Sequence, residues 1–193
     1  ERGKRAGTTN AAGIIGFAKA VELADAHLEE HAAYEAKLRD KLIERVIAEI
    51  PHTVLNGHRT DRLTNNTNFC FRFIEGESLL IMLDRKGICA SSGSACTSGS
   101  LDPSHVLLAI GRPHEIAHGS IRLTLSKDTT EEDIDYTIET LKGIVDRLRS
   151  MSPLYEDFIK NNSLIIFLSL LCVFSLSIAF YKYANNKKIS SIS

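Results

Sequence analysis

The feature that most constrains this chain is a run of 21 residues, 161–181, without a single charged side chain. The centre of the run is almost wholly apolar, and lysine and tyrosine residues flank it. About 20 apolar residues in a helix cross a hydrocarbon core of about 30 Å, and those flanking residues are typical of membrane interfaces. A buried helix of the globular part is the alternative. We expect 161–181 to be a transmembrane helix and 182–193 a short basic polar tail.

The rest of the chain has the composition of a folded domain in a reducing compartment. Hydrophobic residues make up 44% and charged residues 24% of the chain, which excludes a disordered or fibrous protein. With 23 basic and 24 acidic side chains the net charge is -1, so no electrostatic argument favours nucleic-acid binding. No two of the four cysteines form a CxxC pair, which argues against a zinc knuckle or a disulfide framework. These cysteines are Cys70, Cys89, Cys96 and Cys172.

Hydrophobic periodicity predicts interleaved helices and strands. A long helical pattern covers about 11–49, with apolar residues every four positions until Pro51 ends it, and Gly13 and Gly16 suggest close packing in its first turns. Alternation predicts strands over 66–73 and 120–125, and a short apolar segment predicts another over 88–90. Shorter helices are expected over 75–86 and from Pro103 to 110, the second capped by Asp102.

A further helix is expected to begin at Thr130, because three acidic residues follow it in the first turn, where the helix dipole favours them. Its apolar face recurs at helical spacing and its last turn is basic. Alternation of helices and strands around one core indicates an α/β or α+β class. The apolar face consists of Ile134, Ile138, Leu141, Val145 and Leu148.

The most informative stretch for chemistry is the loop 91–100, which holds one cysteine, Cys96, among Ser, Gly, Ala and Thr. A thiol reacts as thiolate and needs access, and a loop of small residues gives both access and mobility. A surface linker with an incidental cysteine is the alternative interpretation. Cys70 and Cys89 lie in strand-like apolar segments and are expected to be inert core sulfurs.

The run Ser-Ser-Gly-Ser-Ala-Cys-Thr-Ser-Gly at 91–99 resembles the active-site loop of NifS/IscS-like cysteine desulfurases. Further blocks at 1–8, 101–106, 117–122 and 152–156 agree with this family in the same order. These desulfurases belong to the class-V aminotransferases, which are pyridoxal 5′-phosphate enzymes of fold type I. The resemblance covers about residues 1–158.

The resemblance implies a reaction, a cofactor and partners. Enzymes of this family are homodimers that use pyridoxal 5′-phosphate to convert L-cysteine to L-alanine, and a mobile cysteine keeps the sulfur as a persulfide. By resemblance Cys96 is that nucleophile. The sulfur passes to an iron–sulfur scaffold protein of the NifU/IscU type. No intrinsic metal site is expected, although the Cys96 persulfide could serve as a transient iron–sulfur ligand.

Two further residues match functional positions of the family. Arg122 corresponds to the arginine that binds the substrate carboxylate, a role suited to its planar guanidinium; a solvent-facing strand arginine is the alternative. Thr8 corresponds to the threonine that contacts the cofactor phosphate in the partner subunit; a helix cap is the alternative. His105, His114 and His118 also match family positions near the loop, and we assign them no catalytic role.

The resemblance also implies a division of the chain. Residues 1–25 correspond to the end of the large cofactor-binding domain and 26–158 to the small C-terminal domain. The family's cofactor lysine follows a Ser/His-containing run that this sequence lacks. We therefore expect the C-terminal portion of a desulfurase, an α/β chain followed by one hydrophobic helix. Its catalytic part would be cytoplasmic and tethered to the membrane.

Two other functions remain open at this stage. One is a membrane-tethered sulfur carrier in which Cys96 receives and donates sulfur without a cofactor site of its own. The other is an inactive fragment. Arg122 and Thr8 favour the enzyme, because a carrier needs neither a carboxylate-binding arginine nor a phosphate contact.

Overall fold

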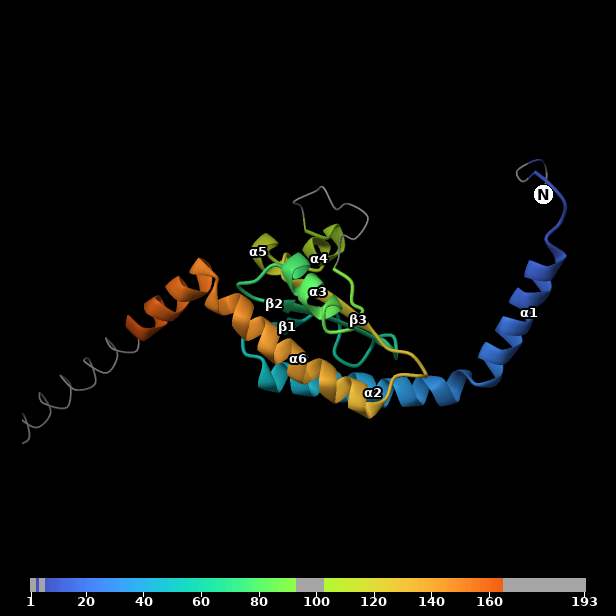
Figure 1. Cartoon of the computed structure of the whole chain (residues 1–193), viewed down its shortest axis with the longest axis horizontal. Helices are drawn as coiled ribbons and strands as arrows, with labels where there is room; N and C mark the ends of the chain where they lie inside the picture. Colours follow the sequence, from blue (N-terminus) through green and yellow to red (C-terminus); the bar gives the residue numbers. More distant parts are fainter. Residues whose placement is uncertain (1–2, 4–5, 93–102, 165–193) are drawn as a thin grey trace, which may run out of the picture.

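The structure is a computed structural model that describes residues 3, 6–92 and 103–164. Figure 1 shows a small sheet with helices on both sides and two helical arms that extend away from it. The elements in chain order are α1 (Ala11–Ala26), α2 (Leu28–Glu49), β1 (Thr53–Leu55), β2 (Asn66–Phe71), α3 (Gly76–Asp84), α4 (His105–Ala109), α5 (His114–Ala117), β3 (Ser120–Thr124) and α6 (Glu131–Ser150). A helical stretch over 153–164 follows α6.

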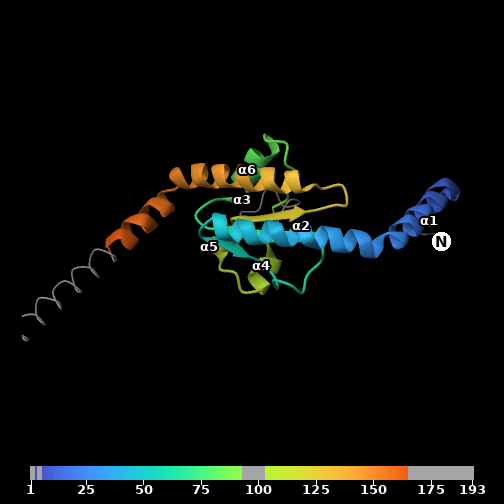
Figure 2. The ribbon, with the colours of Figure 1, turned by 90° about the horizontal axis from the view of Figure 1, so that it is seen from below.

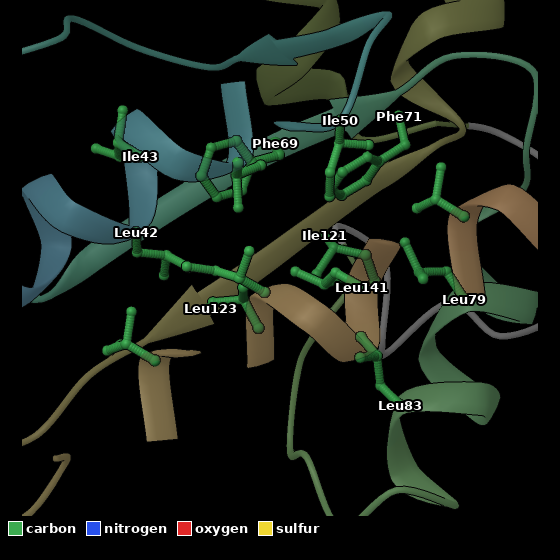
Figure 3. Close-up of a cluster of buried hydrophobic side chains, with 14 of the residues drawn as sticks. Leu42, Ile43, Ile50, Phe69, Phe71, Leu79, Leu83, Ile121, Leu123 and Leu141 are labelled. Carbon is green, nitrogen blue, oxygen red and sulfur yellow. The ribbon is translucent and has the colours of Figure 1, made fainter. Parts of the chain in front are cut away.

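The three strands form an antiparallel sheet in the order β1-β2-β3. Because successive side chains of a strand point to opposite faces, the sheet separates two apolar clusters. The larger cluster contains Phe69 and Phe71 with α2, α3 and α6 on one face, and the smaller contains Cys70 with α4 and α5 on the other. Figure 3 shows the two phenylalanines among leucine and isoleucine side chains from β3 and the helices. The α/β fold class is confirmed.

The predicted helix over 11–49 is in fact two helices that break at His27. His27 has φ −120° and ψ 11°. Helix α1, which precedes it, extends away from the sheet in both views (Figures 1 and 2). None of the residues of α1 is buried, whereas α2 buries Leu38, Leu42 and Val46. The expected close packing at Gly13 and Gly16 is therefore wrong, and Gly13 instead donates its N–H to the side chain of the N-cap, Asn10.

Helix α6 follows the prediction. Thr130 accepts a hydrogen bond from the N–H of Asp133, and the Asp133 carboxylate accepts one from the N–H of Thr130, which is a capping box. All of the predicted apolar face is buried except Leu148, which is half-buried. At the basic C-terminal end of α6, Arg149 is buried and donates hydrogen bonds to the carbonyls of Arg72 and His52.

Other boundaries differ from the predictions. Strand β2 ends at Phe71 rather than 73, because Phe73 has a positive φ of 71° and leaves the extended conformation. Helix α4 begins at His105 with Ser104 as its N-cap, not at Pro103, and Asp102 lies outside the described residues. Two short elements, β1 and α5, were not predicted. Helix α3 and its C-terminal Gly87, at φ 76°, agree with the prediction.

The predicted transmembrane segment cannot be followed in the structure. Only its first residues, 161–164, are described, and they continue the helix after α6. The remainder of 161–181 and all of the tail 182–193 lie outside the described residues. Among the helices that are described, none combines the length and the apolar character needed to cross a membrane.

Candidate functional site

Arg122 occupies the middle of β3, between two core residues. Ile121 and Leu123 are buried in the larger apolar cluster, and the Arg122 side chain is exposed. In the antiparallel register Arg122 pairs with Asn68 and Ser120 pairs with Cys70. Residues in register share a sheet face, so Arg122 belongs to the face that carries α4 and α5.

The segment that leads into the cysteine loop runs along the free edge of β3. Ser91 forms an antiparallel bridge with Arg122: the Arg122 N–H donates to the Ser91 carbonyl at 2.7 Å, and the Ser91 N–H donates to the Arg122 carbonyl at 3.1 Å. This bridge replaces the short strand expected over 88–90. The guanidinium-bearing residue and the start of the loop are therefore held together by two backbone hydrogen bonds.

Cys96 itself lies outside the described residues, and so does most of its loop, 93–102. The chain before the loop is anchored at Ser91, beside Arg122. The chain after it enters α4, whose Leu107 belongs to the cluster on the Arg122 face of the sheet. Cys96 follows Ser91 by five positions in the sequence.

Two glycines hold the start of β3 against the sheet. A Cβ atom at Gly119 would overlap the carbonyl oxygen of Phe71, and one at Gly76 would lie 2.7 Å from the carbonyl of Ser120 and 2.9 Å from that of His118. The close approach allows Phe71 N–H to bond the Gly119 carbonyl and Gly76 N–H to bond the His118 carbonyl, both at 2.9 Å. These backbone contacts fix the position from which Arg122 projects. Sequence reasoning did not identify Gly76 or Gly119 for this role.

The two other described cysteines differ from each other. Cys70 is buried, as expected, and burial raises the pKa of its thiol, while the Asn56 amide donates to its sulfur at 3.0 Å. Cys89 is exposed, so the expectation of a core sulfur is wrong there. It lines an open cavity of about 340 Å³ together with Leu42 from α2 and Tyr136 from α6. Arg122 does not line this cavity.

Thr8 lies far along the chain from the other two predicted site residues. Its side chain is exposed, and Asn10 rather than Thr8 caps α1, so the capping interpretation is wrong. Thr8 precedes α1, which extends away from the sheet (Figure 1). The described part of the chain does not bring Thr8 and Arg122 together.

Comparison with known proteins decides the family. The sequence model of the family described as "Aminotransferase class-V" matches residues 2–137 of this chain. The chain belongs to the class-V aminotransferase family. A cysteine desulfurase named IscS from Clostridium botulinum is 56% identical over 163 residues, which are 83% of this chain and 41% of that protein. IscS from Methanosarcina thermophila is 58% identical over 154 residues, which are 80% of this chain and 38% of that protein.

Solved structures agree with this membership. A NifS-like protein superimposes with a TM-score of 0.65 at 34% identity over 76% of this chain and 36% of its own. A NifS-like protein from Rickettsia africae gives a TM-score of 0.64 at 32% identity, covering 74% of this chain and 36% of its own. The class-V chain studied here therefore spans about two fifths of the length of the relatives that it matches.

The cofactor of the class-V family is pyridoxal 5′-phosphate, and a lysine must lose its proton to hold it. Three of the described lysines do not fit this requirement. Lys41, Lys142 and Lys160 donate hydrogen bonds to the carboxylates of Asp135, Glu49 and Glu156 respectively, which raises their pKa values and favours the charged ammonium. The match covers 41% of IscS from Clostridium botulinum, so the other 59% of that protein has no counterpart in this chain.

Proposed function

We propose that this chain is the cysteine-bearing part of a pyridoxal phosphate-dependent cysteine desulfurase. The enzyme would take sulfur from L-cysteine, release L-alanine and carry the sulfur as a persulfide on Cys96. Relatives named cysteine desulfurase are 54–58% identical to this chain over aligned stretches of 154–163 residues. The observation that carries the proposal is the backbone pairing of Ser91 with Arg122, which ties the origin of the Cys96 loop to the residue proposed to bind the substrate carboxylate.

The chemistry that these residues would perform follows from their types. The Arg122 guanidinium would bind the carboxylate of L-cysteine with two parallel hydrogen bonds, which orients the amino acid. The thiolate of Cys96 would attack the sulfur of the bound substrate, because a thiolate rather than a thiol is the nucleophile. The new S–S bond would form as the Cβ–S bond of L-cysteine breaks, and the electron pair of that bond would stay with the carbon that becomes the methyl group of L-alanine. Residues beyond the matched region would hold the cofactor, and Thr8 would contact its phosphate from the partner subunit of a homodimer.

The persulfide on Cys96 would then pass to an acceptor. A scaffold protein of the NifU/IscU type is the proposed acceptor, and the persulfide could act there as a transient ligand of the growing iron–sulfur cluster. A persulfide survives best in a reducing compartment, so the catalytic part would work in the cytoplasm.

A chimera tests this function directly. Residues 3–158 of this chain would replace the matching region of IscS from Clostridium botulinum, which is 56% identical. We expect the chimera to bind the cofactor and to form alanine and persulfide from L-cysteine. Cys96→Ser in the chimera should abolish persulfide and sulfur transfer and leave the cofactor absorbance intact.

Cys89→Ser is the matched control, because Cys89 is the exposed one of the two described cysteines. It should keep sulfur transfer near the level of the parent chimera. Persulfide mapped by mass spectrometry to Cys89 or Cys70 would contradict the role of Cys96. A folded chimera that binds the cofactor but forms no alanine would contradict the proposed activity.

The segment 161–181 is proposed to anchor the enzyme, with the catalytic part in the cytoplasm and 182–193 on the far side. No charge opposes insertion along its length. Fractionation of cells that make the chain with and without residues 161–193 tests this. The intact chain should stay in the membrane after a carbonate wash; release by the wash, or a cytoplasmic reporter fused at Ser193, would overturn the anchor or its orientation.

A further inference from the structure

Two histidines lie together on α5, outside the proposed sulfur chemistry. Nδ1 of His114 and Nε2 of His118 are 3.1 Å apart, and the ring centroids are 4.5 Å apart at an interplanar angle of 68°. His114 is exposed and His118 is half-buried. Because the contact between the two rings is exposed, water or an ion can reach it.

The separation of the two nitrogens matches that of two ligands on one metal ion. Imidazole nitrogens bind zinc at about 2.0–2.1 Å, and at ligand–metal–ligand angles of about 90–110° they lie about 2.9–3.4 Å apart. The observed 3.1 Å lies within this range. Histidines at positions i and i+4 share one helix face, so the sequence spacing allows the two rings to meet.

The backbone beneath the pair is held in place, which favours binding because little has to be ordered. The His118 carbonyl accepts a hydrogen bond from Gly76 at 2.9 Å, and the neighbouring Gly119 carbonyl accepts one from Phe71 at 2.9 Å. Ala117, between the two histidines, is buried in the smaller apolar cluster. Binding would then require only rotation of the rings and a change of tautomer in the imidazole whose nitrogen carries the shared hydrogen.

A second histidine pair in the chain shows that spacing alone is not enough. His27 and His31 are also four residues apart, but their rings stack at 5.5 Å with an interplanar angle of 21°. Nδ1 of His27 instead contacts the Glu30 carboxylate at 3.4 Å. Parallel stacked rings do not direct two nitrogen lone pairs at one point, so this pair serves as an internal comparison.

We propose that His114 and His118 form an open, two-ligand site for a divalent transition-metal ion of the imidazole-binding class, such as zinc or nickel. Neutral imidazole suits these ions, whereas magnesium prefers oxygen ligands. Within the described residues no group of three or more His, Cys, Asp or Glu side chains could hold a metal. The remaining coordination positions would therefore be taken by water.

Titration of the purified 193-residue chain with Zn²⁺ and Ni²⁺, followed by calorimetry, tests the site. We expect a one-to-one binding event whose dissociation constant rises at least tenfold in His114→Ala and in His118→Ala. The double variant His27→Ala/His31→Ala should bind as the parent does, and Mg²⁺ should not bind at the same concentrations. Thiol sites elsewhere in the chain would be unchanged by these substitutions and are subtracted by the comparison.

Nitrogen chemical shifts of the histidine rings give a second measurement that does not depend on the folding of a variant. On addition of Zn²⁺ to the parent chain, Nδ1 of His114 and Nε2 of His118 should shift together and saturate at one equivalent. His114→Ala is the safer variant, because its side chain is exposed. Equal affinities of the parent and the His114→Ala chain, or zinc-induced shifts confined to His27 and His31, would overturn the proposal.

Discussion

At the scale of single residues, β3 combines a core role with an exposed charge. Ile121 and Leu123 anchor the strand in the core, and Arg122 projects from the opposite face. The N–H and the carbonyl of Arg122 both form hydrogen bonds with the backbone of Ser91. The side chain can therefore be changed without removing a buried contact or a ladder hydrogen bond.

Arg122→Ala in the chimeric enzyme should mainly raise KM for L-cysteine, because it removes a charge-assisted hydrogen bond to the carboxylate. Loss of such a partner costs about 1.5–3 kcal/mol, or roughly ten- to more than a hundredfold. The KM of Arg122→Lys should lie between those of the parent and of Arg122→Ala, since lysine keeps the charge but not the planar pair of donors. Steady-state alanine formation measures both, and an unchanged KM in Arg122→Ala would show that the arginine does not contact substrate.

Gly119 is the residue where the backbone leaves least room. Gly119→Ala places a methyl group against the Phe71 carbonyl, so β3 and β2 must separate locally. Overpacking of this kind costs about 1–3 kcal/mol. Urea unfolding should show that loss in the free energy of unfolding.

Gly143→Ala is the matched control for that experiment. Gly143 lies in α6 with nothing within 4 Å of its potential Cβ, and alanine is favoured over glycine in a helix by about 0.5–1 kcal/mol. We expect Gly143→Ala to stabilise the chain by about that amount. Equal effects of the two substitutions would contradict the steric argument for Gly119.

At the scale of elements, α2 and α6 are joined by ion pairs at the edge of their apolar contact. Arg45 of α2 contacts Asp135 and Glu139 of α6, and Glu49 of α2 contacts Lys142 of α6 at 2.8 Å. Hydrogen bonds from Arg45 and then Lys142 lower the pKa of Glu49 from 4.5 to about 2. These groups are at the surface, so the apolar stripe beneath them supplies most of the attachment.

The lowered pKa of Glu49 predicts the direction of a pH effect. The unfolded chain binds the proton near pH 4.5, whereas the folded chain binds it near pH 2. The contribution of Glu49 to stability is therefore complete above about pH 4.5 and is lost as the pH falls toward 2. Thermal unfolding between pH 2 and 6 should show a shallower acid loss for Glu49→Gln than for the parent.

Glu22→Gln controls for the removal of a carboxylate as such. Glu22 pairs only with Lys19 of its own helix α1, which has no buried residue. The thermal stability of Glu22→Gln should fall with decreasing pH in the same way as that of the parent chain. Parallel profiles of Glu49→Gln and the parent would mean that the α2–α6 ion pairs do not contribute to stability.

At the scale of the whole molecule, the compact part lies between two extended helices. Helix α1 carries exposed apolar side chains, with Phe17 73% exposed. After α6, the stretch 153–164 is attached by an aromatic cluster in which Phe158 meets His52 and Phe73 with ring centroids 5.0 and 4.8 Å apart. The sheet and its helices thus form one body from which α1 extends away.

We predict that the purified 193-residue chain, given pyridoxal 5′-phosphate and L-cysteine, forms no alanine. The Ser/His-containing run that precedes the cofactor lysine of the family does not occur in this sequence, and the described Lys41, Lys142 and Lys160 donate to carboxylates that favour their charged form. Quantification of alanine tests this, with the active chimera as the positive control. Alanine formed by the isolated chain above the rate of free cofactor would contradict the prediction.

Local patterns of the sequence were sufficient for the longest and most periodic elements. The capping box at Thr130 and the apolar face of α6 were predictable, because both depend on contacts within a few residues. The fold class followed from the alternation of helices and strands and from the family resemblance, whereas the role of Arg122 came from that resemblance and remains a prediction. Cys96 was also singled out by sequence, and its role remains a prediction.

Tertiary structure decided what depends on contacts between distant residues. The break at His27 separates α1, which has no buried residue, from α2, which packs against the core, and the spacing of apolar residues did not reveal it. Cys89 is exposed because its segment lies along an open cavity, although its apolar neighbours predicted burial. The pairing of Ser91 with Arg122 and the contact of His114 with His118 depend on how β3 and α5 are held, because strand partners and ring orientations are set by packing and not by the residues alone.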